Sequence, residues 1–279
     1  MQKLLSVLLF AAIFCAACKQ DSKNAAPAEA NITASPDLLG GQWIAMDFCA
    51  RANQYGSVLQ AMNNAHLPYA FALAFNPGEP DSVTCYNGFE TWKLPVKYNS
   101  DTLEMVGARP GKSIFLMYDS QNEKDLTMFD VTTGQAHLDK FIKSRANTAD
   151  AYQAFLTALN HNIMGGLFVP MSKGASGDVQ FTPGGYIHGI KDYDRYELCT
   201  AGDCFVAGDA IDIITLSNSK VENSGKFFGY RFSAQNDTLS IYTMINAKPE
   251  EKGAYKVGNI VYKLLRKKAP ANGGGSATQ

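Results

Sequence analysis

The feature that most constrains this chain is a series of short segments in which large apolar residues alternate with small or polar ones. In Tyr69–Phe75 every second residue is large and apolar, and the residues between are alanines. Phe228, Tyr230 and Phe232 alternate in the same way. Successive side chains of a strand point to opposite faces, so this pattern predicts strands with one buried face. Turn signals recur roughly every eight to twelve residues, which predicts a mainly antiparallel all-β fold, either a barrel or a sandwich.

The composition supports a folded body and excludes several classes of protein. Hydrophobic residues make up 46% of the 279 residues, and 25 Lys and Arg stand against 26 Asp and Glu. A chain with this apolar content can bury a core, so it is not disordered throughout, and its composition does not fit a polytopic membrane protein. The balanced charge argues against electrostatic binding of nucleic acid.

Three stretches have helical periodicity. Apolar side chains fall at helical spacing over Tyr55–Met62 and more briefly over Leu138–Ile142. A third stretch, Tyr152–Leu159, follows a plausible helix cap at Thr148. We expect a few short helices that cover openings of the sheets.

The chain also matches itself. Leu39–Met46 aligns with Met164–Met171, and Gly111–Phe115 aligns with Gly225–Gly229 in the same order. An ordered series of matches indicates a duplication. We therefore predict two tandem β units, barrels or sandwiches, although the halves could also close one larger barrel. The expected bounds are 37–134 for the first unit, 135–161 for a helical connector and 162–268 for the second unit.

Both ends of the chain lack the pattern of the folded body. Residues 1–17 contain Lys3 and then the apolar run Leu4–Phe14, which is too short to span a bilayer and is typical of an export signal. Residues 18–36 and 269–279 are rich in small and polar residues without hydrophobic periodicity. We expect the first of these to be a flexible tether and the second a disordered tail.

The end of the signal, Phe14-Cys15-Ala16-Ala17-Cys18, resembles the lipobox of bacterial lipoproteins. The resemblance implies that Cys18 is lipidated and becomes the first residue of the mature chain. Cys15 stands where the lipobox usually has Leu, so a plain secretory signal cleaved after Ala17 is the alternative. Lys19 replaces the Asp that retains many lipoproteins at an inner membrane, so the resemblance implies an anchor in the outer membrane of a bacterial envelope.

Gly41-Gln42-Trp43 resembles the G-x-W motif of lipocalin-like proteins, in which the Trp closes one end of a barrel and a basic residue of the last strand lies over it. The final strand pattern, Asn259–Arg266, offers Arg266 for this cation–π contact. The resemblance implies tandem lipocalin-like units. If the halves are separate barrels, however, Trp43 and Arg266 belong to different units.

Four cysteines follow Cys18, and an even number in an exported chain indicates disulfides. A bridge from Cys199 to Cys204 would close a short loop, which leaves Cys49 with Cys85, although the sequence does not determine the connectivity. Zinc is the poorer interpretation, because there is no second closely spaced cysteine pair and no histidine nearby.

No complete catalytic or cofactor motif is present. There is no G-x-S-x-G turn, and the histidines occur singly. Gly107–Ser113 is one residue short of a phosphate-binding loop and precedes a strand pattern, so we expect a turn. His188, Asp192 and Asp194 are the best candidates for an acid/base or divalent-ion site, and a polar turn is the preferred interpretation. We therefore expect no metal and no cofactor.

The aromatic content is the remaining signal, with 16 Phe, 13 Tyr and 2 Trp. A barrel of about eight strands encloses room for its own side chains or for one small ligand. Inward aromatic side chains are therefore candidate ligand-binding residues, namely Trp92, Tyr186, Phe228, Tyr230 and Phe232. The alternative is that they pack the core and leave no cavity.

Together these observations predict a membrane-anchored, exported lipoprotein that acts as a non-enzymatic binding module for a small apolar or aromatic ligand. The competing hypothesis is an envelope scaffold that binds a partner protein through exposed apolar patches or edge strands. An enzyme built around His188 is the third hypothesis.

Overall fold

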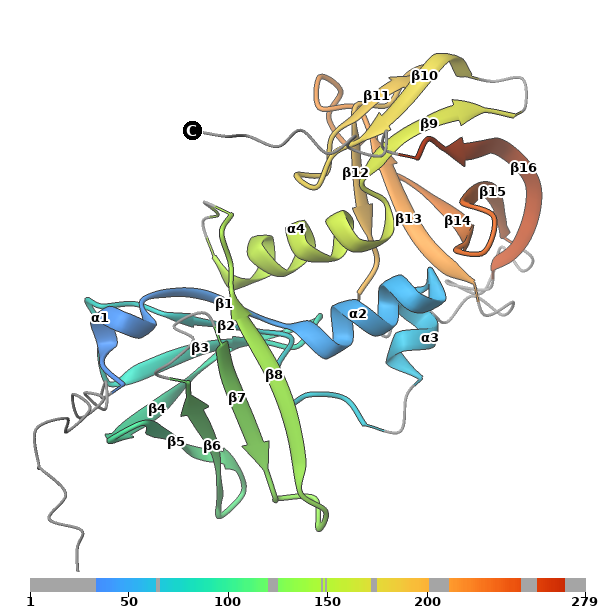
Figure 1. Cartoon of the computed structure of the whole chain (residues 1–279). Coiled ribbons are helices and arrows are strands. Elements are labelled where there is room, and N and C mark those ends of the chain that lie inside the picture. The colour runs from blue at the N-terminus through green and yellow to red at the C-terminus, as the bar shows by residue number, and fades with distance from the viewer. Residues whose placement is uncertain are drawn as a thin grey trace, which may run out of the picture. The chain divides into compact units, whose positions relative to one another are not determined.

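The computed structural model describes residues 34–63, 66–119, 125–146, 148, 150–171, 175–200, 211–246 and 255–268. Within them the chain is mainly antiparallel β-structure in two barrel-like sheets of eight strands each (Figure 1). This confirms the predicted fold class. The expected signal and tail lie outside the described residues, as do Cys18 and Cys204, so lipidation and the Cys199–Cys204 bridge stay predictions. No helix in the described ranges is long and apolar enough to cross a bilayer.

The first unit is a closed barrel in which each strand pairs with the next and the last pairs with the first. The pairing of Trp43 with Lys143 and of Ile44 with Ile142 closes it. Its strands are β1 (Gly41–Ala45), β2 (Ala72–Phe75), β3 (Ser82–Tyr86), β4 (Thr91–Asn99), β5 (Thr102–Arg109), β6 (Lys112–Tyr118), β7 (Asp125–Asp130) and β8 (His137–Lys143).

The second unit repeats this strand order. Its last strand pairs with its first, as in the first unit, but the sheet is interrupted between its third and fourth strands. One isolated bridge in the described residues, from Tyr186 to Arg195, spans that interruption. The strands are β9 (Gly166–Pro170), β10 (Ala175–Phe181), β11 (Ile187–Ile190), β12 (Arg195–Leu198), β13 (Asp212–Ser217), β14 (Lys226–Ser233), β15 (Thr238–Asn246) and β16 (Tyr255–Arg266).

The repeats seen in the sequence fall on equivalent strands. Leu39–Met46 contains β1 and Met164–Met171 contains β9, the first strand of each unit. Lys112 and Lys226 begin β6 and β14, the sixth strand of each. This agreement supports an origin by duplication.

Four helices lie in the described ranges: α1 (Pro36–Leu39), α2 (Met46–Tyr55), α3 (Val58–Met62) and α4 (Ala151–Ile163). The helix predicted at Tyr152–Leu159 is α4, but its cap is Asp150 instead of Thr148, since the Asp150 carboxylate accepts a hydrogen bond from the Gln153 amide at 2.8 Å. The helix predicted over Tyr55–Met62 is interrupted at Gly56, whose φ of 61° ends α2.

The helix expected over Leu138–Ile142 is wrong, because this segment lies in β8. Asp139 and Phe141 are buried, whereas Leu138 and Lys140 are exposed, which is the period of a strand. The apolar residues fall on both faces of this strand, so their local spacing is that of a helix. Pairing with β1 on one side and with β7 on the other makes the segment a strand.

Each unit holds an aromatic side chain of its first strand beneath a cation of its last strand. In the first unit the ammonium of Lys143 lies 5.7 Å from the ring centroid of Trp43. In the second the guanidinium of Arg266 lies 5.2 Å from the ring of Phe168. The expected contact of Arg266 with Trp43 is therefore wrong, because the two residues belong to separate units.

The same two cations also donate hydrogen bonds to the helix that precedes each first strand. Lys143 donates a hydrogen bond to the carbonyl oxygen of Leu38 in α1 at 2.8 Å. Arg266 donates to the carbonyl oxygen of Ile163 at the end of α4. Each cation therefore satisfies a helix carbonyl that has no partner within its own helix.

The two units contact each other at the start of α3. The hydroxyl of Ser57 donates a hydrogen bond to one carboxylate oxygen of Asp212 at 2.5 Å, and the Leu59 amide donates to the other at 2.8 Å. Burial raises the pKa of Asp212, and these hydrogen bonds offset part of the rise. A carboxylate of the second unit thus shares the capping of a helix of the first.

Candidate functional site

Three of the predicted ligand-binding residues are buried on the inner face of the second unit. Phe228, Tyr230 and Phe232 lie on β14, and Tyr230 is fully buried beside Asp212. Phe232 packs beneath the guanidinium of Arg266, at 4.4 Å from its ring centroid. These residues form part of the packed core and do not line either groove described below.

The other two predicted residues lie apart from them and from each other. Trp92 is in β4 of the first unit, where its indole N–H donates to the hydroxyl of Tyr69 at 3.2 Å. Tyr186 is 44% exposed, and the guanidinium of Arg195 lies 3.6 Å from its ring centroid. The five aromatic residues therefore do not converge on one cavity, and their role in ligand binding stays a prediction.

The predicted Cys49–Cys85 disulfide is wrong, since both cysteines are free and buried. The register aligns Trp43, Leu73 and Cys85, so Cys85 shares the inner face of the barrel with Trp43. Cys49 lies on α2 and lines a groove with Ile44, which follows Trp43 and faces the outer side. The barrel wall separates the two thiols.

The candidate acid/base residues lie on β11 and in the turn between β11 and β12. His188 is exposed on β11 opposite Gln180. The carboxylate of Asp194 accepts hydrogen bonds from the Ser219 hydroxyl at 2.5 Å and amide at 2.7 Å, which lowers its pKa. Asp192 occupies a turn position with a φ of 68°. Among the described residues no cluster of His, Cys, Asp or Glu is arranged to hold a metal ion.

Two histidines that are far apart in the sequence do come together. The rings of His66 and His137 stack with centroids 3.7 Å apart, and Nε2 of His66 lies 3.0 Å from a carboxylate oxygen of buried Asp139. These contacts join β8 to the segment that precedes β2. The singly spaced histidines of the sequence carried no signal of this cluster.

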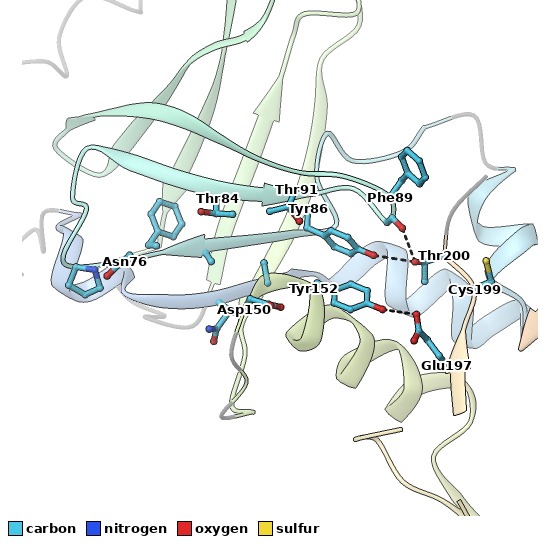
Figure 2. A pocket seen from close by; sticks show the side chains of 16 residues that line it. Asn76, Thr84, Tyr86, Phe89, Thr91, Asp150, Tyr152, Glu197, Cys199 and Thr200 are labelled. Carbon is cyan, nitrogen blue, oxygen red and sulfur yellow. Dashed lines mark hydrogen bonds between the residues drawn. The ribbon is translucent and has the colours of Figure 1, made fainter. Parts of the chain in front are cut away.

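A groove of about 820 Å³ lies between the outer face of the first barrel, the beginning of α4 and the end of β12. Figure 2 shows its side chains, and we call it the Tyr86 groove. The residues with aromatic or hydrogen-bonding side chains that define it include Thr84, Tyr86, Phe89, Tyr152, Glu197 and Thr200.

The groove is hollow because the outward face of β2 carries small side chains. The alternation in Tyr69–Phe75 places Ala74 opposite the inward-facing Leu73 and Phe75. Ala74 pairs with Gln42 of β1 and with Thr84 of β3, and all three line the groove. A larger residue at Ala74 would fill this space.

Two tyrosines from different parts of the chain meet in the groove. The rings of Tyr86 and Tyr152 pack edge to face, with centroids 5.3 Å apart. The Thr200 hydroxyl donates to the Gly88 carbonyl at 2.9 Å, so the Tyr86 hydroxyl, 3.3 Å from it, acts as its donor. The Tyr152 hydroxyl donates to a carboxylate oxygen of Glu197 at 2.6 Å (Figure 2). Both units therefore build the groove.

The electrostatics of the groove are acidic. Its described lining residues include Asp150 and Glu197 and no Lys, Arg or His. Burial raises the pKa of Tyr152, and the hydrogen bond to Glu197 raises it further. Burial also raises the pKa of Tyr86. Both phenols thus stay protonated at neutral pH, and the two carboxylates make the charge of the groove negative.

Comparison of the chain with protein-family models, with curated proteins and with solved structures finds no significant match.

The sequence did not single out Tyr86, Tyr152 or Glu197. Two signals pointed near them: the alanine face of Tyr69–Phe75, and the helical apolar face that begins at Tyr152. Nothing in the sequence indicated that these two elements and β12 lie together, because their residues are far apart along the chain.

Proposed function

We propose that this protein is a non-enzymatic binding module and that the Tyr86 groove is its ligand site. The observation that carries the proposal is a groove of about 820 Å³ in which phenol and carboxylate groups lie beside apolar side chains such as Ala74 and Phe89. Small-molecule sites commonly have this mixture and a volume of roughly 300–1,000 Å³. The ligand is a small molecule with an apolar or aromatic face and hydrogen-bonding groups, uncharged or cationic.

The groove accounts for a ligand better than the barrel interiors do. In the first barrel the inner face carries the fully buried Trp43, Leu73, Leu103 and Met105. The inward aromatic residues of the second unit are packed in the same way. The groove has an exposed aromatic side chain, Phe89, and carboxylates that a ligand can reach.

The test is native mass spectrometry of the chain without residues 1–18, after incubation with a small-molecule extract of its own host's envelope. We expect an adduct with the wild type and with Thr127→Trp, which places the same side chain on the outer face of β7. Ala74→Trp, which fills the groove, should lose it. An adduct that Ala74→Trp retains in full would contradict the proposal.

The charge of the ligand is tested by Glu197→Gln. This change keeps the size of the side chain and removes one negative charge from the groove. A cationic ligand should bind about tenfold more weakly, because a charge-assisted hydrogen bond is lost. An uncharged ligand should bind within about twofold of the wild-type affinity.

We also propose that the chain is exported and anchored to the outer membrane through Cys18, so that the membrane is its first partner. The lipobox-like sequence before Cys18 supports this. Cells that express the chain should incorporate labelled palmitate into it, and Cys18→Ala should abolish the label. Label that survives in Cys18→Ala would contradict the anchor.

The second candidate function is an envelope scaffold. Phe89 favours it, because this side chain is 64% exposed at the groove, and exposed aromatic residues are enriched in protein interfaces. A photo-crosslinking residue at position 89 should then trap one partner protein in cells. The binding-module proposal expects no such protein crosslink.

A further inference from the structure

A second groove, of about 590 Å³, lies on another face of α4 and is unlike the first. We call it the α4 groove. Its floor is apolar and is formed by β1, α2, β8 and α4, with the side chains of Ile44, Met46, Cys49, Ile142, Ala154 and Ala158.

The hollow has a simple origin in side-chain size. Ala154 and Ala158 are one helical turn apart, so they share a face of α4. Ile44 and Ile142 are paired neighbours on the outer face of the barrel. Small side chains on the helix therefore face branched ones on the sheet and leave a space between. Burial raises the pKa of the Cys49 thiol to about 12, so it remains protonated and acts as a small apolar group.

The charges at this groove are basic where those of the Tyr86 groove are acidic. Arg145 and His161 line it and are exposed, and neither forms an ion pair with the described residues. Asp125 also lines it, but its carboxylate lies 2.6 Å from the ammonium of Lys140. Lys143 also lines the groove, but its ammonium donates to the carbonyl oxygen of Leu38. The guanidinium of Arg145 is therefore an exposed fixed charge that a ligand can reach.

We propose that the α4 groove binds a small amphipathic anion, a carboxylate or sulfonate joined to an apolar chain. The apolar chain lies on the floor between Ile44 and Ala158, and the anionic group meets Arg145 at the rim. The proposal rests on this groove alone and does not depend on the ligand of the Tyr86 groove.

Calorimetric titration of the chain without residues 1–18 with decanoate tests this, with decanol as the uncharged probe. Decanoate should bind the wild type, below its micellar concentration, with higher affinity than decanol. Arg145→Gln should weaken decanoate about tenfold and leave decanol unchanged, because only the charge contact is lost. Lys97→Gln removes an exposed positive charge elsewhere on the barrel and should change neither affinity.

The position of the site is tested by two variants that add bulk. Ala158→Phe should abolish decanoate binding, and Ala74→Trp should leave it unchanged. Arg145→Gln keeps the test valid if Ala158→Phe fails to fold, because Arg145 is exposed. The proposal is overturned if the wild type does not bind decanoate, if Arg145→Gln binds it as tightly as the wild type, or if Ala74→Trp is the variant that loses it.

Discussion

The two β units have the same strand order but differ in how their third and fourth strands pair, and we call this position the seam. Both place an aromatic residue of the first strand beneath a cation of the last strand, and both have the same strand order. In the first unit β3 pairs with β4 along its whole length, from Ser82 to Tyr86. In the second unit the equivalent strands, β11 and β12, are four residues long and are joined by one isolated bridge among the described residues.

The two units share the contacts that form the core, and they differ at the strands that lie next to the Tyr86 groove. The shared aromatic–cation pair lies where first and last strands meet, and its aromatic ring is fully buried in the core of each unit. The seam lies elsewhere, and its fourth strand, β12, carries Glu197 toward the Tyr86 groove. Because β12 is not fully paired on its β11 side, its end can contact the first unit at the groove.

The most damaging test of this comparison is to remove the two core aromatic residues. Trp43→Ala and Phe168→Ala should each lower the free energy of unfolding by about 4 kcal/mol, because both side chains are fully buried. Urea denaturation measures this. Phe227→Ala, which removes a ring that is 61% exposed, should change stability little. A small effect at only one of the two buried positions would break the equivalence of the units.

The contact between the units is tested by Asp212→Ala. The change leaves the Leu59 amide without its acceptor and removes the partner of Ser57, at an expected cost of about 2 kcal/mol. Denaturation followed by probes in each unit should then show transitions that no longer coincide. Asp178→Ala, at an exposed ion pair with Lys267, should leave them coincident. Coincident transitions in Asp212→Ala would mean that this contact does not couple the units.

Much of the fold could be predicted from the sequence, because alternation and turns are local signals. The pattern at Phe228–Phe232 lies in β14, and the repeat at Leu39–Met46 marks β1. The spacing of Leu138, Phe141 and Ile142 predicts a helix, and only pairing with distant strands makes this segment a strand.

The candidate site was far less predictable. Tyr86, Tyr152 and Glu197 come from β3, α4 and β12, and only tertiary packing brings them together. The Cys49–Cys85 bridge failed for the same reason, since a count of cysteines says nothing about which side of a barrel wall each occupies.

Two buried carboxyl groups, Asp130 in the first unit and Asp212 in the second, should give the stability opposite dependences on pH. Burial favours the protonated form of both, but at Asp130 hydrogen bonds from Thr132 and the charge of Arg109 outweigh it and lower the pKa. At Asp212 burial dominates and raises the pKa. Asp130 therefore contributes stability above its unfolded pKa of about 4 that is lost as pH falls through the folded value. Asp212 contributes stability below about pH 4 that is lost as pH rises through its folded value.

Urea denaturation over a series of pH values checks these opposite signs. Asp130→Asn should reduce the loss of stability on acidification, and Asp212→Asn should reduce the loss as pH rises from about 4. If both variants shift the profile in the same direction, the two carboxyl groups do not differ as described.

The smallest expected effect comes from the cations. Lys143→Met and Arg266→Met keep much of the apolar stem but lose the cation–π contact and the bond to a helix carbonyl, at an expected cost of about 1 kcal/mol each. Thermal unfolding measures this. Lys93→Met, at an exposed ion pair with Glu79, should give no measurable change. If Lys93→Met and Lys143→Met change the stability equally, the cation of the last strand does not contribute to the stability of the first unit.

We propose that the ligand lies between the units and not inside either barrel. A crystal structure of the chain with the adduct recovered from its host's envelope tests this most directly. We expect ligand density in contact with Tyr86 and Tyr152. Density inside the first barrel beside Trp92, or inside the second unit beside Tyr230, would contradict it.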